Sequence, residues 1–128
     1  MDILFDTCSF LWLTLEPDKI PAPVMAAFKD VGNTVFLSSV SSWEITLKYQ
    51  TEKLPLPEPP ETFLPEARKY QGIISLDLTE KHISHLGKLP AIHKDPFDRI
   101  LICQAIENGL TIVTPDGHIR QYPVKTLW

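Results

Sequence analysis

The chain has 128 residues, 44% hydrophobic and 22% charged, a composition typical of one globular domain with a single core. Its 12 basic and 16 acidic residues give a net charge of −4, which excludes nucleic-acid binding through bulk positive charge. A site for RNA would therefore need a local source of positive charge, such as a divalent cation held by carboxylates.

The first half of the chain predicts two strands and three helices. The apolar run at residues 3–5 stops at Asp6 and is typical of a strand buried on both faces. The other expected elements are helices at 9–15, 23–30 and 41–49 and a strand at 34–38. Ser41 and Glu44 have the spacing of a capping box at the start of the third helix, with Ser41 as the N-cap.

The second half opens with a proline-rich segment, residues 54–60, whose four prolines exclude regular structure and predict a surface arm. The clearest helix follows Asp95, the expected N-cap, with Pro96 at N1 and Asn108-Gly109 as a left-handed stop. The remaining expected elements are helices at 62–70 and 79–86 and strands at 73–76, 110–114 and 124–127.

Strands that alternate with helices predict an α/β fold of three layers. We expect a central, mainly parallel, twisted sheet of about five strands, flanked by helices. Residues 1–128 are expected to form one domain, because too little chain lies on either side of the prolines to build two cores.

Cysteine usage and the N-terminus predict a cytoplasmic protein. Cys8 and Cys103 form no CxxC motif, are too few for a disulfide framework, and are expected to be small buried hydrophobic side chains. The N-terminus has no basic region, and no apolar run approaches the ~20 residues of a membrane span. We therefore expect neither secretion nor membrane insertion.

Four acidic residues are placed so that they can converge. Asp6 and Asp116 follow predicted strands, and parallel strands end at one edge of a sheet, where ligands bind. Glu44 and Asp98 fall in the first turns of predicted helices that face the same edge. Two carboxylates ~5 Å apart at an effective dielectric of ~20 repel by roughly 3 kcal/mol. Magnesium or manganese would reverse that repulsion and bridge phosphate oxygens, which predicts phosphodiester hydrolysis.

Each acid also has a purely structural interpretation. Glu44 could serve only the capping box, Asp98 could complement the dipole of its helix, and Asp116 could be a turn residue. Asp6 is harder to explain in this way, because an acid directly after a buried strand needs a partner.

Basic side chains near these acids have alternative roles as well. Lys48 and Arg99 are expected either to contact substrate phosphate or to pair with an acid, and the ion pair is favoured for Lys48. His93 is either a cleft residue or a loop histidine bonded to backbone. His82 and His85 lack further ligands at zinc spacing and are expected at the surface.

Five segments carry a family pattern, in this order: Leu4–Thr7 with Leu11–Trp12, Ser39–Ile45 with Lys48, Leu89–Arg99, Gln104–Ala105, and Val113–Asp116. Together they resemble VapC-type PIN-domain ribonuclease toxins of type II toxin–antitoxin pairs. The resemblance covers essentially the whole chain, and residues 93–99 are its most specific part.

The resemblance implies a catalytic metal site for Mg²⁺ or Mn²⁺, made by four carboxylates and supported by three neighbours: Asp6, Glu44, Asp98 and Asp116, with Thr114, Asp95 and Thr7. It implies RNA cleavage through a metal-activated water that leaves 5′-phosphate and 3′-hydroxyl ends. Cys8 departs from the histidine or alanine common at its position in such proteins.

The resemblance also implies partners. The substrate would be an RNA such as tRNA or rRNA, and the free protein would inhibit translation until a cognate VapB-type antitoxin binds it. A homodimer and a toxin–antitoxin hetero-oligomer are expected, with no membrane partner. The proline-rich segment and Leu11–Trp12 are candidate contact surfaces, as are Lys48, Arg99 and His93 for substrate or antitoxin.

Two other functions remain open. A catalytically silent PIN scaffold would use the acidic cleft only to bind a basic peptide. A phosphatase or receiver-type domain would use Asp6 as a phosphoryl acceptor.

Overall fold

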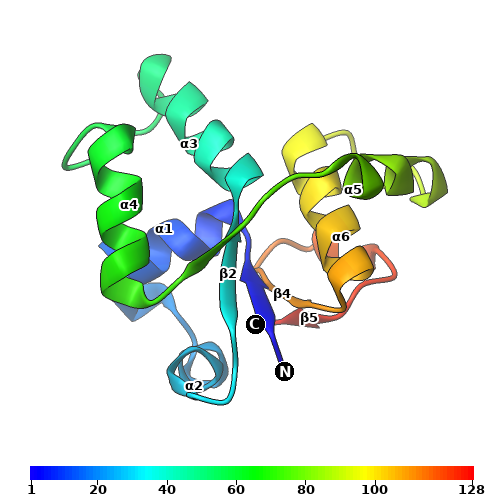
Figure 1. The fold of residues 1–128 in the computed structure, drawn as a ribbon, viewed down its shortest axis with the longest axis horizontal. Coiled ribbons are helices and arrows are strands. Elements are labelled where there is room, and N and C mark those ends of the chain that lie inside the picture. The colour runs from blue at the N-terminus through cyan, green and yellow to red at the C-terminus, as the bar shows by residue number, and fades with distance from the viewer.

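The computed structural model describes residues 1–128 and has helices on both sides of a five-stranded sheet (Figure 1). The strand order is β3-β2-β1-β4-β5, and every neighbouring pair is parallel. The strands are β1 (Ile3–Phe5), β2 (Val35–Ser38), β3 (Ile74–Leu76), β4 (Thr111–Val113) and β5 (Thr126–Leu127). The helices are α1 (Thr7–Leu15), α2 (Ala22–Lys29), α3 (Ser39–Gln50), α4 (Pro60–Gln71), α5 (Glu80–Ser84) and α6 (Pro96–Asn108), with 3-10 turns η1 (Pro17–Lys19), η2 (His85–Lys88) and η3 (Ile119–Gln121). The predicted α/β fold is confirmed, with a sheet that is parallel throughout.

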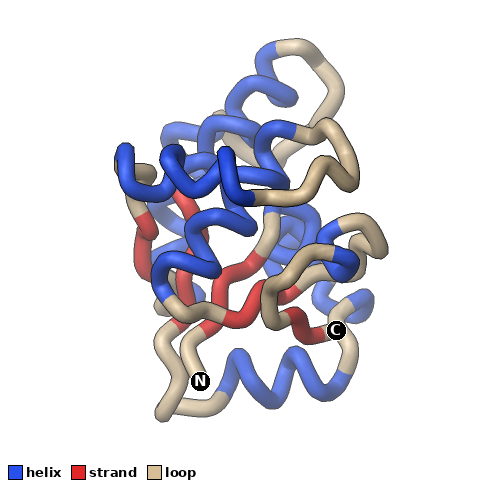
Figure 2. The backbone as a smooth tube through the Cα atoms, turned by 90° about the vertical axis from the view of Figure 1, so that its right-hand side faces the viewer, coloured by secondary structure: helices blue, strands red, loops and turns tan.

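Two apolar clusters on opposite faces of the sheet hold the helices in place. Along β1 the side chains alternate: Ile3 and Phe5 belong to the cluster with α1, α2 and α4, whereas Leu4 belongs to the cluster with α6. All three are fully buried, as expected for a central strand that is covered on both faces. In Figure 1, α1 and α4 lie on one side of β2 and α6 lies on the other. Figure 2 shows the strands lying between the helices.

The register of the three central strands brings their C-terminal ends to one level. The last residue of β1 pairs with Leu37 in β2 and with Val113 in β4. The residues that come next, Asp6, Ser38 and Thr114, therefore lie at the same edge of the sheet, and all three are buried. This edge is where the expected ligand site of a parallel sheet would be.

The predicted capping box of Ser41 and Glu44 is wrong. α3 begins at Ser39, directly after β2, and the Ser38 hydroxyl accepts a hydrogen bond from the Val40 N–H at 3.0 Å. In Figure 1 the helix rises from the end of the strand without a linker. Because the helix starts earlier than predicted, Glu44 lies in its second turn rather than its first, and a capping role for Glu44 is excluded.

The proline-rich segment is attached to the body of the protein rather than free. It is irregular up to Pro59, but Pro60 is the first residue of α4, a position where a missing N–H costs little. Leu54 and Leu56 pack against the apolar cluster of α1, α2 and α4. The prediction of irregular structure was therefore wrong for Pro60, and the prediction of a surface arm was only partly correct.

Two side chains differ from the prediction in their exposure to solvent. His82 is buried, because its Nδ1 accepts the Thr79 N–H at 3.1 Å and its Nε2 lies 2.8 Å from Asn108 Oδ1, which joins the start of α5 to the end of α6. Cys8 is exposed, because the buried residues of α1 are Thr7, Ser9, Phe10 and Leu13. Cys103 is buried, as predicted.

None of the helices could span a bilayer. The longest, α6, has 13 residues, short of the ~20 that a bilayer core requires. No other helix combines enough length with enough apolar character.

Candidate functional site

All four predicted carboxylates, together with Asp95, line one cavity of about 790 Å³. They come from the end of β1, from α3, from the start of α6 and from the loop after β4. The rest of the wall is formed by Thr7, Cys8, Leu11, Trp12, Leu15, Glu16, Lys48, Lys53, Leu54, Pro55 and Pro115. Segments from both halves of the chain therefore meet at this site, which includes part of the proline-rich segment.

Asp6 is the N-cap of α1 as well as the first residue after β1. Its Oδ1 accepts hydrogen bonds from the Ser9 N–H at 2.8 Å and from the Ser9 hydroxyl at 2.6 Å. Only 3% of the residue is exposed. Burial raises the pKa of Asp6, and the hydrogen bonds from Ser9 and Thr114 oppose that rise. Asp6 is thus a buried carboxyl group held in place by its own helix.

Both carboxylate oxygens of Glu44 are occupied by protein donors. The Thr7 hydroxyl donates to Oε1 at 2.7 Å, and the Lys48 ammonium donates to Oε2 at 2.5 Å. The hydrogen bond to Glu44 is also the main cause of a raised pKa at Lys48. The ion pair favoured for Lys48 is therefore present, and Thr7 directly supports Glu44.

The surroundings of Asp98 also disfavour its negative charge. Burial raises its pKa to about 6, the hydrogen bond from His93 opposes the rise, and the charges of Asp95, Asp116 and Asp6 add to it. Asp95 is the N-cap of α6, as predicted, because its Oδ1 accepts the Asp98 N–H at 3.0 Å. The cap therefore brings a second negative charge close to Asp98.

Asp116 is held by the loop that follows β4. Its N–H donates to the buried Thr114 hydroxyl at 3.0 Å, and its Oδ1 accepts the His118 N–H at 2.7 Å. The His118 ring lies 3.4 Å from the same oxygen. Thr114 also donates toward Asp6, so it links the acids that end β1 and β4.

Two of the predicted contact residues lie behind the cavity wall rather than in it. Arg99 donates to the Pro90 carbonyl at 2.9 Å and to the Tyr122 hydroxyl at 3.0 Å, so it pairs with no acid. The His93 ring contacts Asp98 and Tyr122, and neither alternative considered for it included this tyrosine. Sequence reasoning missed Tyr122, which no local signal connects to residues more than 20 positions away.

The donor set of the cavity fits a hard divalent cation in chemistry. Its converging anions are all carboxylates, and the raised pKa values of Asp6 and Asp98 indicate negative charges that a cation would stabilise. No three or more His, Cys, Asp or Glu side chains are already grouped closely enough to hold a metal ion. Three of the acids are instead engaged by Lys48, His93 and His118, so these contacts would have to adjust.

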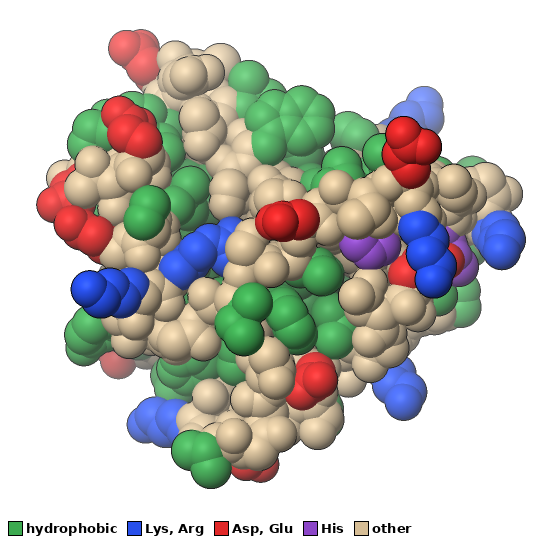
Figure 3. Space-filling model, viewed as in Figure 1, with side chains coloured by type: hydrophobic (Ala, Val, Ile, Leu, Met, Phe, Trp, Pro, Cys, Tyr) green, Lys and Arg blue, Asp and Glu red, His purple; other side chains and the backbone are tan.

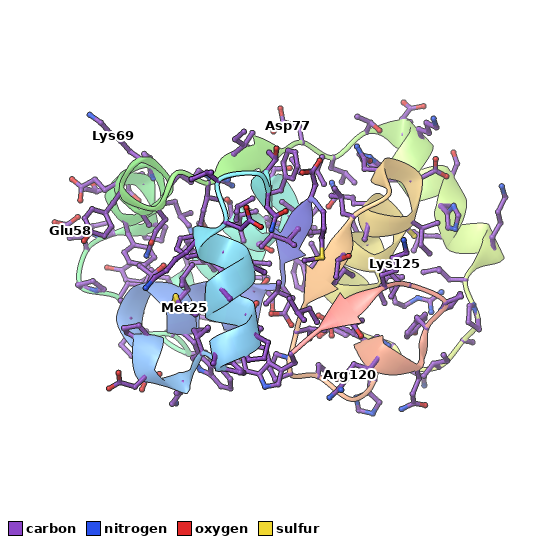
Figure 4. The ribbon with its side chains drawn as sticks, turned by 90° about the horizontal axis from the view of Figure 1, so that it is seen from below. Met25, Glu58, Lys69, Asp77, Arg120 and Lys125 are labelled. Carbon is purple, nitrogen blue, oxygen red and sulfur yellow. The ribbon has the colours of Figure 1, made fainter.

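Basic side chains do not form a broad patch on the face seen in Figure 3, where acidic and basic groups are interspersed. Viewed from below, Lys69 and Arg120 lie on opposite sides of the molecule (Figure 4). The cations that line the cavity are Lys48 and Lys53. A polyanion at this site would therefore be neutralised locally rather than by the overall charge of the protein.

Comparison with protein families and curated proteins gives consistent matches. A family model described as PIN domain matches residues 3–125. Ribonuclease VapC16 of Mycobacterium tuberculosis is 34% identical over 102 residues, which are 80% of this chain and 68% of that protein. Ribonuclease VapC22 of the same organism is 24% identical over 98% of both chains.

Solved structures with the same fold include two VapBC structures. VapBC2 from Rickettsia felis, bound to a DNA fragment from its promoter, matches with a TM-score of 0.75 and 18% identity, over 99% of this chain and 98% of that chain. DNA-bound VapBC from Salmonella typhimurium matches with a TM-score of 0.66 and 20% identity, over 99% and 97%. At these identities the likeness demonstrates the fold alone.

Proposed function

The chain belongs to the PIN-domain family, in its VapC group, and from this premise we propose that it is a metal-dependent endoribonuclease and the toxin of a VapBC-type pair. The observation that carries the proposal is the convergence of Asp6, Glu44, Asp98 and Asp116 on one cavity. Hydrolysis of an RNA phosphodiester bond would leave 5′-phosphate and 3′-hydroxyl ends. Residues 1–128 would form the whole nuclease domain.

The carboxylates would hold Mg²⁺ or Mn²⁺ through oxygen ligands. When bound, such an ion would supply positive charge to the phosphate and lower the pKa of a bound water. The role of this protein would be to hold the carboxylate oxygens in place. Asp6 is fixed by its helix cap, Glu44 by its hydrogen bond from Thr7, and Asp116 by the loop after β4. Asp6 is buried and the Asp98 side chain is only 17% exposed, so a cation would meet these two carboxylates in surroundings less polar than bulk water.

Charge supports a role for the cation in binding RNA as well as in cleaving it. A protein with a net charge of −4 repels a polyanion at long range. The lysines of the cavity, Lys48 and Lys53, are the nearest protein cations. Because Lys48 is paired with Glu44, much of the charge that meets a substrate phosphate would come from the bound ion.

Partners follow from the relatives. Both curated relatives carry the name ribonuclease, so we propose RNA as the substrate, with tRNA or rRNA as the first targets to examine. The solved neighbours are VapBC complexes, so we propose a cognate VapB-type antitoxin, a homodimer and a toxin–antitoxin hetero-oligomer. Free of antitoxin, the protein would inhibit translation in the cytoplasm.

A silent scaffold that binds a basic peptide is the competing function. The observation that favours it is the Lys48 ammonium, which already sits on Glu44 inside the cavity. A basic side chain of a partner could be held in the same way. This alternative predicts peptide binding without RNA cleavage under any metal condition.

The two functions are separated by RNA cleavage with Mn²⁺ present and absent. We expect the purified chain to cut RNA internally with Mn²⁺, and Asp6→Asn to abolish both cutting and Mn²⁺ binding. Asp77→Asn is the matched control, because Asp77 also follows a strand, β3, but is exposed and lies outside the cavity. Mn²⁺-independent cutting, or full activity of Asp6→Asn, would contradict the proposal.

A further inference from the structure

His93 has a hydrogen-bond partner on each ring nitrogen. Its Nε2 lies 3.1 Å from Asp98 Oδ2, and its Nδ1 lies 2.8 Å from the Tyr122 hydroxyl. The side chain is only 12% exposed. A neutral imidazole carries one N–H, so one of these nitrogens donates and the other accepts. The bonds made by Tyr122 decide which.

The Tyr122 hydroxyl oxygen accepts hydrogen bonds from two groups that can only donate. Arg99 Nη1 lies 3.0 Å away and the His93 backbone N–H lies 3.1 Å away. These donors fill both lone pairs, and the single hydroxyl hydrogen is left for His93 Nδ1, which is nearer than the His93 carbonyl at 3.5 Å. A protonated Nδ1 would place a third donor on a hydroxyl with two lone pairs. The neutral ring therefore carries its proton on Nε2, directed at Asp98.

We propose that His93 is a positioning residue for Asp98, held in the Nε2–H form by Tyr122 and Arg99. The Nε2–H commits Asp98 Oδ2 to one hydrogen bond and leaves Oδ1 without a protein donor. A fixed carboxylate with one free oxygen is pre-organised as a ligand. The inference deepens the proposed nuclease function and rests on it, since Asp98 is there one of the cation-binding acids.

A second histidine ring stacks on the ring of His93. The His118 ring lies parallel to it, with centroids 5.3 Å apart and an interplanar angle of 14°. His118 in turn contacts Asp116 through its backbone N–H and its ring. The two stacked histidines thus connect two of the acids that line the cavity.

The first test is nitrogen-15 NMR of the histidine rings in the metal-free protein at neutral pH. We expect His93 to show a protonated Nε2 and an unprotonated Nδ1. Tyr122→Phe removes the hydroxyl that holds Nδ1, so it should shift His93 toward a mixture of the two forms. Tyr70→Phe, at an exposed tyrosine, should change nothing. A proton on Nδ1 in the unmodified protein would overturn the inference.

The second test is calorimetric titration with Mn²⁺. We expect His93→Ala to weaken binding by about 10–100-fold and His93→Gln to recover part of the loss, because its amide N–H₂ can also donate to Asp98. His85→Ala is the matched control, since His85 also contacts a carboxylate, Glu107, away from the cavity. Unchanged Mn²⁺ affinity in folded His93→Ala would overturn the inference while leaving the nuclease proposal intact. If the unmodified protein bound no Mn²⁺, the nuclease proposal would fail, and the NMR result alone would decide the role of His93.

Discussion

Two histidine–carboxylate pairs of similar geometry lie in opposite electrostatic surroundings. Where α5 and η2 pack on α6, His85 Nδ1 lies 2.8 Å from Glu107 Oε1, and behind the cavity His93 Nε2 lies 3.1 Å from Asp98 Oδ2. The four side chains are between 12% and 20% exposed. The hydrogen bond from His85 lowers the pKa of Glu107, whereas burial raises the pKa of Asp98 to about 6 despite its histidine.

The difference lies in the neighbours of each pair. Lys81 and Lys88 add positive charge around Glu107, and Lys81 Nζ lies 3.7 Å from its carboxylate. The largest charges that act on Asp98, apart from its histidine, are those of three further acids, Asp95, Asp116 and Asp6, and Lys48 is a cation of the same cavity. One histidine is therefore enough to complete a stabilised ion pair but not to neutralise a group of carboxylates. The comparison separates a contact that stabilises the fold from one that is suited to binding a cation.

The largest expected effect is on catalysis. Asp98→Asn should lower the rate of RNA cleavage by at least about 100-fold, because it removes a charged oxygen ligand at the reacting phosphate. Glu107→Gln should leave the rate unchanged, although it disrupts the pair at α6. Single-turnover cleavage at saturating Mn²⁺ measures both variants. Equal losses in the two variants would mean that the cavity has no special role.

The second effect is on the pH dependence of stability, with opposite signs for the two pairs. The folded-state pKa of Asp98, about 6, lies above its ordinary value of 3.8. As pH falls, Asp98 therefore binds a proton at a higher pH in the folded protein than in the unfolded chain. The free energy of unfolding should therefore rise as pH falls from about 6 to about 4, by on the order of 1 kcal/mol after solvent screening. Glu107 has a lowered pKa, so its contribution is present above pH 4.5 and is lost as pH falls through the folded-state value.

Urea unfolding at pH 3, 4, 5, 6 and 7 checks this prediction. Asp98→Asn should reduce the rise at low pH and leave the part that belongs to Asp6, whose pKa is also raised by burial, and Glu107→Gln should lower stability at pH 7 more than at pH 3. An undiminished rise in Asp98→Asn would contradict the role given to Asp98.

The smallest effect concerns the lysine that occupies the cavity. Lys48→Met should tighten Mn²⁺ binding by roughly 3-fold, because the ammonium competes with a cation for Glu44. Lys81→Met, at the pair of α6, should leave Mn²⁺ binding unchanged. Calorimetric titration measures the difference, and weaker binding in Lys48→Met would instead indicate that Lys48 orients Glu44 for the ion.

Prediction of the fold from the sequence was most accurate where it rested on local capping and turn signals. Asp95, Pro96 and Gly109 mark both ends of α6 correctly, because capping, the fixed proline φ and a left-handed glycine each act within one turn. The alternation of strands and helices also predicted the sheet, because parallel strands need crossover helices. The convergence of the four carboxylates followed from that topology.

The misses come from contacts that are distant along the chain. Ser41 was a reasonable N-cap by spacing, but β2 continues directly into α3 and Ser38 takes the role. His82 is buried only because α5 packs on Asn108 of α6, 26 residues away. Arg99 was expected near phosphate or an acid, yet the carbonyl of Pro90 holds it behind the cavity. No periodicity or motif encodes such contacts.

The central claim is that the carboxylates of the cavity, and not the acid of the α6 pair, bind a divalent cation. The most direct measurement is a Mg²⁺ titration that follows the carboxylate carbon-13 NMR signals of Asp6, Glu44, Asp98, Asp116 and Glu107. The account predicts saturable shifts of the four cavity signals together, with Glu107 unmoved. Cavity signals that stay still, or that move no more than Glu107, would contradict it.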